Sequence, residues 1–212
     1  MCNLDASGFK YSTGSNLDYI KIAYEFLIEA YQGLSTKNYN ACENNENKIR
    51  NDLVKIAKSR KKINFPFRWI TEFPDIENNN RIDIDLATPQ SLIDDSNAIK
   101  IECKIVGENK YIDTEKSFEG KSPTNGIMSF ITGKYSPQMP LAGMIGFIKT
   151  GEIHDKINHI KKRLQDHKEI ITHQNLTKYP IKENFKYSYD SKHKRINNLK
   201  DISIYHLFFD FT

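Results

Sequence analysis

Two segments in the middle of the chain alternate strictly between apolar and polar residues, which is the pattern of half-buried β-strands. They span residues 81–86 and 99–106. The apolar positions are Ile82, Ile84 and Leu86, and then Ile99, Ile101, Cys103 and Ile105. The polar positions are Arg81, Asp83 and Asp85, and then Lys100, Glu102 and Lys104. We expect two strands that each bury one face and carry charges on the other.

The rest of the chain alternates between helical and strand periods. Helices are predicted over residues 16–33, with Ser15 or Asn16 as the N-cap, and over residues 42–60, 122–133 and 152–173. Strands are predicted over the aromatic-rich residues 65–73 and over the continuous apolar run at 141–148. Residues 186–195 and 202–210 predict a hairpin that turns through Asn197 and Asn198. This order of elements predicts an α/β fold.

The charged faces of the two alternating segments bring three functional groups together if the strands pair. Asp83 and Glu102 would then lie near each other, with Lys104 two residues further along the same face. Carboxylates are hard oxygen ligands that suit Mg²⁺, and an ammonium group beside them can balance charge during hydrolysis. This combination is typical of a magnesium site that hydrolyses phosphodiester bonds. The alternative is an amphipathic hairpin with a solvated acidic face.

The same residues give the chain a resemblance to the PD-(D/E)XK nucleases, also called restriction-endonuclease-like. The motif of that family is an Asp on one strand and Glu-x-Lys on the next, here Asp83 with Glu102, Cys103 and Lys104. The resemblance implies that Asp83, Glu102 and the main-chain carbonyl of Cys103 bind Mg²⁺, with Mn²⁺ as a substitute. It also implies that Lys104 orients or activates the attacking water. Ile82 stands where the family has Pro, and Asp85 is the alternative first ligand.

One acidic residue interrupts the apolar stripe of the helix predicted over residues 42–60. The stripe consists of Cys42, Ile49, Leu53, Ile56 and Ala57. Glu46 lies on it, and a buried carboxylate without a partner is costly. Arg50, four residues later, can form an ordinary helical ion pair with it. The resemblance implies instead that Glu46 reaches the metal site as a catalytic residue and ligand.

The resemblance also implies a fold and an activity for the whole chain. The expected core is restriction-endonuclease-like, a mixed central β-sheet flanked by helices, with an N-terminal helix and a C-terminal helix and β-hairpin appended. One nuclease domain would span residues 1–212, with a helical part at 1–38, the catalytic core at 39–150 and a basic part at 151–212. The expected activity is Mg²⁺-dependent cleavage of DNA in bacterial restriction, anti-phage defence or repair. The alternatives are a ribonuclease and a non-catalytic nucleic-acid-binding or scaffold subunit.

Composition limits the class of protein further. A chain of 212 residues with 38% hydrophobic content can bury one sizeable core. No segment approaches the roughly 20 apolar residues of a transmembrane helix, and the polar N-terminus lacks a signal-peptide pattern. Cys2, Cys42 and Cys103 are too scattered for a disulfide framework or a zinc site. We expect a reduced cytoplasmic protein without membrane contact, targeted as a homodimer or by a partner protein.

Positive charge is concentrated towards the C-terminus. Residues 149–200 contain 13 Lys and Arg against 6 Asp and Glu, whereas the whole chain has a net charge of +4. The apolar stripe of the helix predicted there consists of Ile153, Ile157, Ile160, Leu164 and Ile171. Lys161, Lys162 and Arg163 lie mostly off it and are either nucleic-acid contacts or a solvated basic face. His154 and His159 are five residues apart, which excludes a zinc site on one helix face.

The last two predicted strands carry a polar cluster. Ser191, His193 and Arg195 alternate onto one face of the first strand. His206 shares a face of the second strand with Ile204 and Phe208. The cluster could bind a phosphate, which makes His193 and Arg195 candidate nucleic-acid contacts. Alternatively, the two histidines are buried and hydrogen-bonded, which is the interpretation that we favour.

Overall fold

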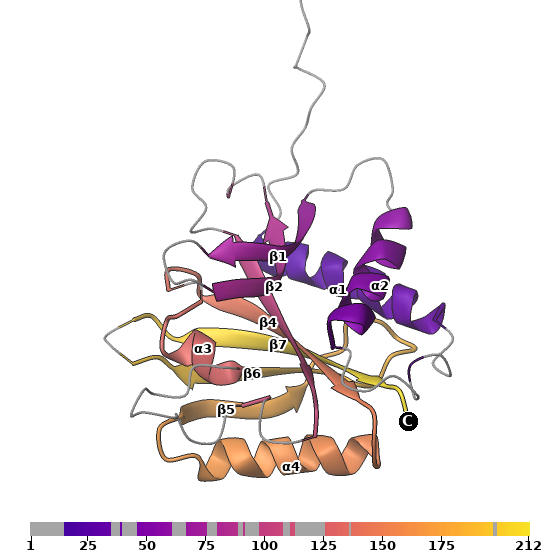
Figure 1. Cartoon of the computed structure of the whole chain (residues 1–212). Helices are drawn as coiled ribbons and strands as arrows, with labels where there is room; N and C mark the ends of the chain where they lie inside the picture. Colours follow the sequence, from indigo (N-terminus) through magenta and orange to yellow (C-terminus); the bar gives the residue numbers. More distant parts are fainter. Residues whose placement is uncertain are drawn as a thin grey trace, which may run out of the picture.

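The computed structural model (Figure 1) describes residues 15–34, 39, 46–60, 67–75, 80–88, 91, 98–107, 111–112, 126–135, 137–196 and 199–212. In these residues the chain forms an α/β fold with four helices and one seven-stranded mixed sheet. The helices are α1 (Asn16–Gln32), α2 (Glu46–Ser59), α3 (Ile127–Ile131) and α4 (Ile153–Asp166). The strands are β1 (Arg68–Asp75), β2 (Asn80–Ala87), β3 (Ile99–Ile105), β4 (Leu141–Ile148), β5 (Ile171–Lys178), β6 (Ser188–Lys194) and β7 (Ile202–Asp210).

The strand order β1-β2-β3-β4-β7-β6-β5 combines both halves of the chain in one sheet. β1, β2 and β3 are antiparallel, β4 is parallel to β3 and to β7, and β7, β6 and β5 are antiparallel. β7 pairs with β4 from Leu141, opposite Ser203, to Ile148, opposite Asp210. The C-terminal strands are therefore part of the central sheet, and the prediction that they form an appended hairpin is wrong in this respect.

Two hydrophobic layers cover the two faces of the sheet. One contains buried residues of α1 and α2, such as Leu27 and Leu53, against Ile101 of β3. The other contains buried residues of α3 and α4, such as Phe130 and Ile157, against Met144 of β4. Figure 1 shows α1 and α2 together, and α4 along β5 at the far edge of the sheet. α2 is thus the helix that lies against β3.

Local chemistry fixes the position of α1. Ser15 and Asp18 form a capping box, in which the Ser15 side chain accepts from the Asp18 N–H and the Asp18 carboxylate accepts from the Ser15 N–H. The Tyr24 hydroxyl donates to the Tyr205 carbonyl at 2.8 Å. A Cβ at Gly143 would lie 2.5 Å from that hydroxyl, so only glycine lets α1 pack this closely on β4.

Most predicted elements are confirmed, and the helices are shorter than predicted. α2 begins at Glu46, and Ile49, Leu53 and Ala57 are buried on its inner face as predicted. Cys42 lies outside the described residues, as do Ser122–Asn125 before α3 and the predicted turn at Asn197 and Asn198. Among the described helices, none has both the length and the apolar content that crossing a membrane requires.

The helix predicted over residues 152–173 is wrong beyond Asp166. α4 ends there, a turn follows, and Ile171–Lys178 form the edge strand β5. Ile171 lies seven residues after Leu164 and so fits the helical stripe, but it is 56% exposed. The β-branched residues Ile170, Ile171 and Thr172 favour a strand over a helix.

Candidate active site

The candidate site lies where β2 and β3 separate. The two strands pair from Leu86, opposite Ile99, to Ile84, opposite Ile101. Beyond it, the Cys103 N–H donates to Asp83 Oδ2 at 2.8 Å, and the Ile105 N–H donates to Glu46 Oε2 at 3.0 Å. Two carboxylates thus take the place of the carbonyl acceptors that a neighbouring strand would supply.

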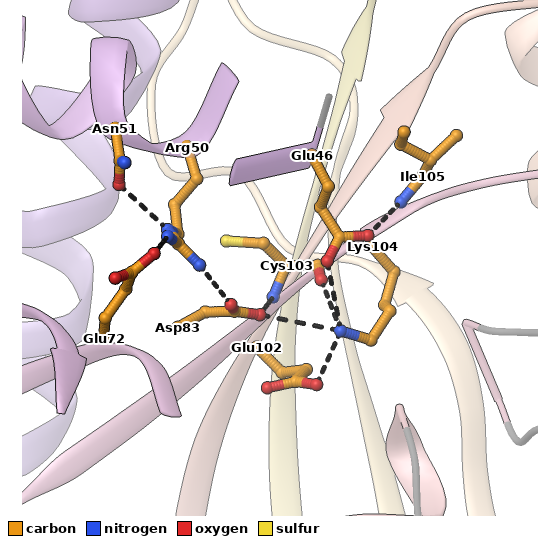
Figure 2. A network of polar contacts seen from close by, with 9 residues as sticks. All are labelled: Glu46, Arg50, Asn51, Glu72, Asp83, Glu102, Cys103, Lys104 and Ile105. Carbon is orange, nitrogen blue, oxygen red and sulfur yellow. Dashed lines mark hydrogen bonds and ion pairs between the residues drawn. The ribbon is translucent and has the colours of Figure 1, made fainter. Parts of the chain in front are cut away.

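The Lys104 ammonium lies at the centre of four oxygen atoms (Figure 2). Its Nζ is 2.7 Å from Glu102 Oε1, 2.8 Å from the Cys103 carbonyl oxygen, 3.3 Å from Glu46 Oε1 and 3.6 Å from Asp83 Oδ2. Its side chain is 14% exposed. Burial alone would lower the pKa of Lys104, but the charges of Glu102, Asp83 and Glu46 outweigh burial and raise it. Lys104 is therefore a fixed cation that holds the side chains of three acidic residues together.

Glu102 is the most buried acid of the cluster. Its Oε1 pairs with Lys104, whereas its Oε2 is buried and has no hydrogen-bond partner. Burial raises the pKa of Glu102 to about 8; the Lys104 charge opposes this shift, and the Asp83 charge adds to it. In its charged form this oxygen is costly to bury without a partner, and a bound cation would supply that partner.

The structure brings the predicted residues Asp83, Glu102, Cys103, Lys104 and Glu46 together. Of the two candidate aspartates, only Asp83 contacts Lys104, while Asp85 is buried at 4% exposure opposite Lys100. Glu46 is directed at β3 and Lys104. The alternative in which Arg50 pairs with Glu46 is wrong, because the guanidinium of Arg50 contacts other residues.

Arg50 is a part of the site that the sequence interpretation missed. It is 2% exposed, and it donates to Asp83 Oδ1 at 2.5 Å and to Glu72 Oε1 at 2.6 Å. A signal was present, because Arg50 lies three residues before Leu53, on the buried side of the helix. No pattern in the sequence indicates Glu72, whose role depends on the pairing of β1 with β2.

The chemistry of these oxygens suits a hard divalent cation. In the described part of the chain, no group of three or more His, Cys, Asp and Glu side chains is arranged to hold a metal ion. Mg²⁺ does not require such a group, since it binds through one or two carboxylates and keeps several waters. Asp83 and Glu102 supply two carboxylates, and the Cys103 carbonyl supplies a third oxygen. These residues therefore fit a Mg²⁺ ion.

The predicted basic residues lie at a distance from this site. α4 packs against β5, four strands from β3, which is roughly 20 Å at the usual strand spacing. The predicted apolar stripe of α4 is buried from Ile153 to Leu164. Lys162 is exposed, Arg163 is half-buried, and Lys161 Nζ lies 5.4 Å from the centre of the Tyr189 ring. The three residues thus remain candidates for a contact outside the carboxylate cluster.

The polar cluster of the last strands is buried. Ser191, His193 and His206 are 0% exposed, and Arg195 is 2% exposed. Arg195 Nη1 donates to the Pro137 carbonyl at 2.8 Å. The assignment of His193 and Arg195 to nucleic-acid contacts is therefore corrected, because neither side chain reaches the surface. The burial favours the alternative of two histidines in a hydrogen-bonded network.

The network is a continuous chain of hydrogen bonds. Its atoms, in order, are Tyr111 Oη, His206 Nδ1 and Nε2, Ser191 Oγ, His193 Nε2 and Nδ1, and Thr172 Oγ1, with contacts of 2.8 to 3.2 Å. Thr172 Oγ1 can also donate to the Leu164 carbonyl. If every hydroxyl and ring N–H donates to the next atom in this order, each donor has an acceptor. We infer neutral histidines, with the proton on Nε2 of His206 and on Nδ1 of His193.

This network predicts a loss of stability in mild acid. Burial lowers the pKa of His193 to about 4 and lowers that of His206 as well; the charge of His173 adds to the shift of His193, and the charge of His193 adds to the shift of His206. Below about pH 6.5 the unfolded chain therefore binds more protons than the folded protein does. We expect the contribution of the two histidines to the free energy of unfolding to be maintained above that pH and to fall towards pH 4, by up to about 1.4 kcal/mol per pH unit for each histidine.

Urea titrations from pH 7.5 to 4.5 measure this dependence. His206→Gln should make the slope of stability against pH less positive by up to about 1.4 kcal/mol per pH unit, whatever its effect on absolute stability, because one titrating histidine is gone. His159→Gln, at an exposed position of α4, should leave the slope unchanged. Equal slopes for wild type and His206→Gln would show that His206 does not titrate between the folded and unfolded states.

Comparison with known proteins gives no relative for this chain: no family model, no curated protein and no solved structure matches it.

Proposed function

We propose that this chain is a metal-dependent nuclease that hydrolyses DNA, with a restriction-endonuclease-like core. The observation that carries the proposal is the convergence of Asp83, Glu102 and Lys104 where β2 and β3 separate, with Glu102 Oε2 buried and without a hydrogen-bond partner. The order α2, β1 to β3, α3, β4 around this site supports the assignment of the core.

Each residue has a role that follows from its surroundings. Asp83, Glu102 and the Cys103 carbonyl would hold Mg²⁺, which would stabilise charge on the scissile phosphate and favour ionisation of a bound water. Lys104 would then lose its contacts with Glu102 and the Cys103 carbonyl and be free to donate to the attacking water or to the phosphate. Glu46, fixed by the Ile105 N–H, would keep Lys104 near the cluster.

A gel assay tests the proposal. Purified protein is incubated with supercoiled plasmid, linear duplex DNA and RNA, each with Mg²⁺, with Mn²⁺ or with EDTA. We expect cleavage of DNA with either metal and none with EDTA, and nicking or linearisation of the plasmid. Cleavage of RNA alone would show that the same site belongs to a ribonuclease. No cleavage of any substrate would remove the enzymatic assignment.

The basic residues of α4 give a separate prediction about DNA binding. Replacing Lys161, Lys162 and Arg163 together with Gln should weaken binding to all sequences alike, since phosphate contacts do not read bases. The slope of log affinity against log salt concentration should become shallower by about 0.9 for each phosphate contact that is lost. Fluorescence anisotropy with labelled duplexes at several salt concentrations measures both quantities.

The triple variant should keep its cleavage rate at saturating DNA, because α4 does not contact the carboxylate cluster. Replacing the exposed residues Lys55 and Lys58 of α2, and Arg60 directly after it, with Gln gives a control of equal charge change. If the α4 variant matches wild type in affinity and in salt slope, Lys161, Lys162 and Arg163 form only a solvated face.

A further inference from the structure

We propose that Arg50 and Glu72 form a charge-neutral clamp that positions Asp83 for metal binding. The clamp is defined as these two residues, one from α2 and one from β1, with the Arg50 guanidinium between the carboxylates of Glu72 and Asp83 (Figure 2). The inference rests on the proposed metal site. It goes beyond that site because neither residue would touch the metal.

Arg50 of the clamp and the Cys103 N–H together fix the Asp83 carboxylate through both of its oxygen atoms. Arg50 Nη1 donates to Oδ1 at 2.5 Å, and the Cys103 N–H donates to Oδ2 at 2.8 Å. Hydrogen bonds to both oxygens restrict rotation of the carboxylate, since turning it would break one bond or the other. Each oxygen accepts one of these bonds and retains a second lone pair for a ligand. Asp83 is thus oriented without losing its capacity to bind.

Charge explains why Arg50 requires Glu72. An arginine paired with Asp83 alone would cancel the negative charge that attracts a cation. Glu72 Oε1 accepts from Arg50 Nη2 at 2.6 Å, so that the formal charges of Arg50 and Glu72 balance. The pair contributes orientation, and Asp83 keeps its full charge towards the metal site. Hydrogen-bond partners that orient a ligating carboxylate raise its affinity for metals.

The backbone of Glu72 has an unusual conformation that a contact of the side chain must hold in place. Among the described residues, Glu72 is the only one other than glycine with a positive φ, at 55°. A side chain makes this conformation unfavourable, and it persists only where the surroundings hold it. Glu72 lies between Thr71, opposite Ile84, and Phe73, opposite Ile82, and is therefore beside Asp83. The ion pair to the buried Arg50 is a contact that can hold this conformation.

Isothermal titration calorimetry with Mg²⁺, without DNA, tests the clamp. Glu72→Gln keeps the size of the side chain but removes its charge, and Arg50 then opposes the metal. We expect Mg²⁺ affinity to fall by about tenfold, which is the lower end of the usual effect of removing a group that orients a metal ligand. Glu72→Asp should recover part of the affinity, because the charge returns on a shorter side chain. In cleavage assays the Mg²⁺ concentration for half-maximal rate should rise, while the rate at saturating Mg²⁺ stays within a few-fold of wild type.

A matched control is available at Glu29. Its carboxylate pairs with Lys182 at 2.7 Å and is 40% exposed, as is that of Glu72. Glu29→Gln therefore removes a similar ion pair far from Asp83, and it should leave Mg²⁺ affinity unchanged. A purely structural role for Glu72 would alter melting temperature without altering the calorimetric affinity.

The outcomes separate the clamp from the proposed function. Equal Mg²⁺ affinity in wild type and Glu72→Gln would overturn the clamp and leave the metal site intact. Mg²⁺ binding that weakens in Glu72→Gln, in a protein that cleaves no nucleic acid, would support the clamp and overturn the nuclease. If the wild type binds no Mg²⁺, both proposals fall. Because Glu72 is exposed, its variants should fold, so the test does not depend on replacing the buried Arg50.

Discussion

Replacing Glu102 with Gln, or Asp83 with Asn, should reduce Mg²⁺-dependent DNA cleavage by at least about 10²-fold, a typical cost of removing a group that stabilises transition-state charge. Each change removes a carboxylate charge and keeps the size of the side chain. Glu102→Gln should not lower the melting temperature of the metal-free protein, because burial already disfavours the charged form and raises the pKa of Glu102 to about 8. Single-turnover cleavage and thermal unfolding measure the two effects.

Asp85→Asn is the control for this result, since Asp85 lies two residues from Asp83 on β2 but outside the cluster. It should retain cleavage within a few-fold of wild type. Loss of activity in Asp85→Asn with full activity in Asp83→Asn would exchange the roles of the two aspartates. Full activity of Glu102→Gln would contradict the assignment of this cluster as the catalytic site.

Replacing Lys104 with Met should abolish cleavage and also destabilise the metal-free protein. Three carboxylates would lose the cation between them, and removal of one partner of a buried ion pair costs about 3 kcal/mol. Mg²⁺ should restore much of this stability, because it would supply positive charge to the same oxygens. Urea unfolding of wild type and Lys104→Met, with Mg²⁺ and with EDTA, gives the four free energies that are needed.

Lys182→Met is the comparison variant for stability. Its ion pair with Glu29 has the same 2.7 Å separation as that of Lys104 with Glu102, but both of its side chains are more exposed to solvent. We expect a loss of under about 1 kcal/mol and no response to Mg²⁺. If Lys104→Met unfolds like wild type with and without Mg²⁺, the carboxylates are not held together by the Lys104 charge.

The sequence predicts the centre of the site because the relevant signals are local. Strict alternation identifies β2 and β3, and the same alternation places Glu102 and Lys104 on one face. Glu46 stands out as an acid on an apolar helical stripe. These predictions need only the period of a strand or a helix, which a single segment of sequence contains.

The sequence does not predict the contacts that depend on how distant segments meet. Arg50 reaches Asp83, 33 residues away, and Glu72, 22 residues away. The position of β7 between β4 and β6 also depends on pairing between distant strands. β5 was missed for a different reason: Ile171 continues the helical period of α4 by coincidence, and periodicity alone does not show where the helix ends.

The central claim, that Asp83 and Glu102 form a catalytic metal site, is tested most directly by crystals grown with Mn²⁺. Anomalous scattering locates Mn²⁺ without assumptions about ligands. We predict an anomalous peak in contact with Asp83, Glu102 and the Cys103 carbonyl, with the Lys104 ammonium displaced from the centre of the oxygen cluster. A structure in which Lys104 keeps that place and Mn²⁺ is absent or bound elsewhere would contradict the account.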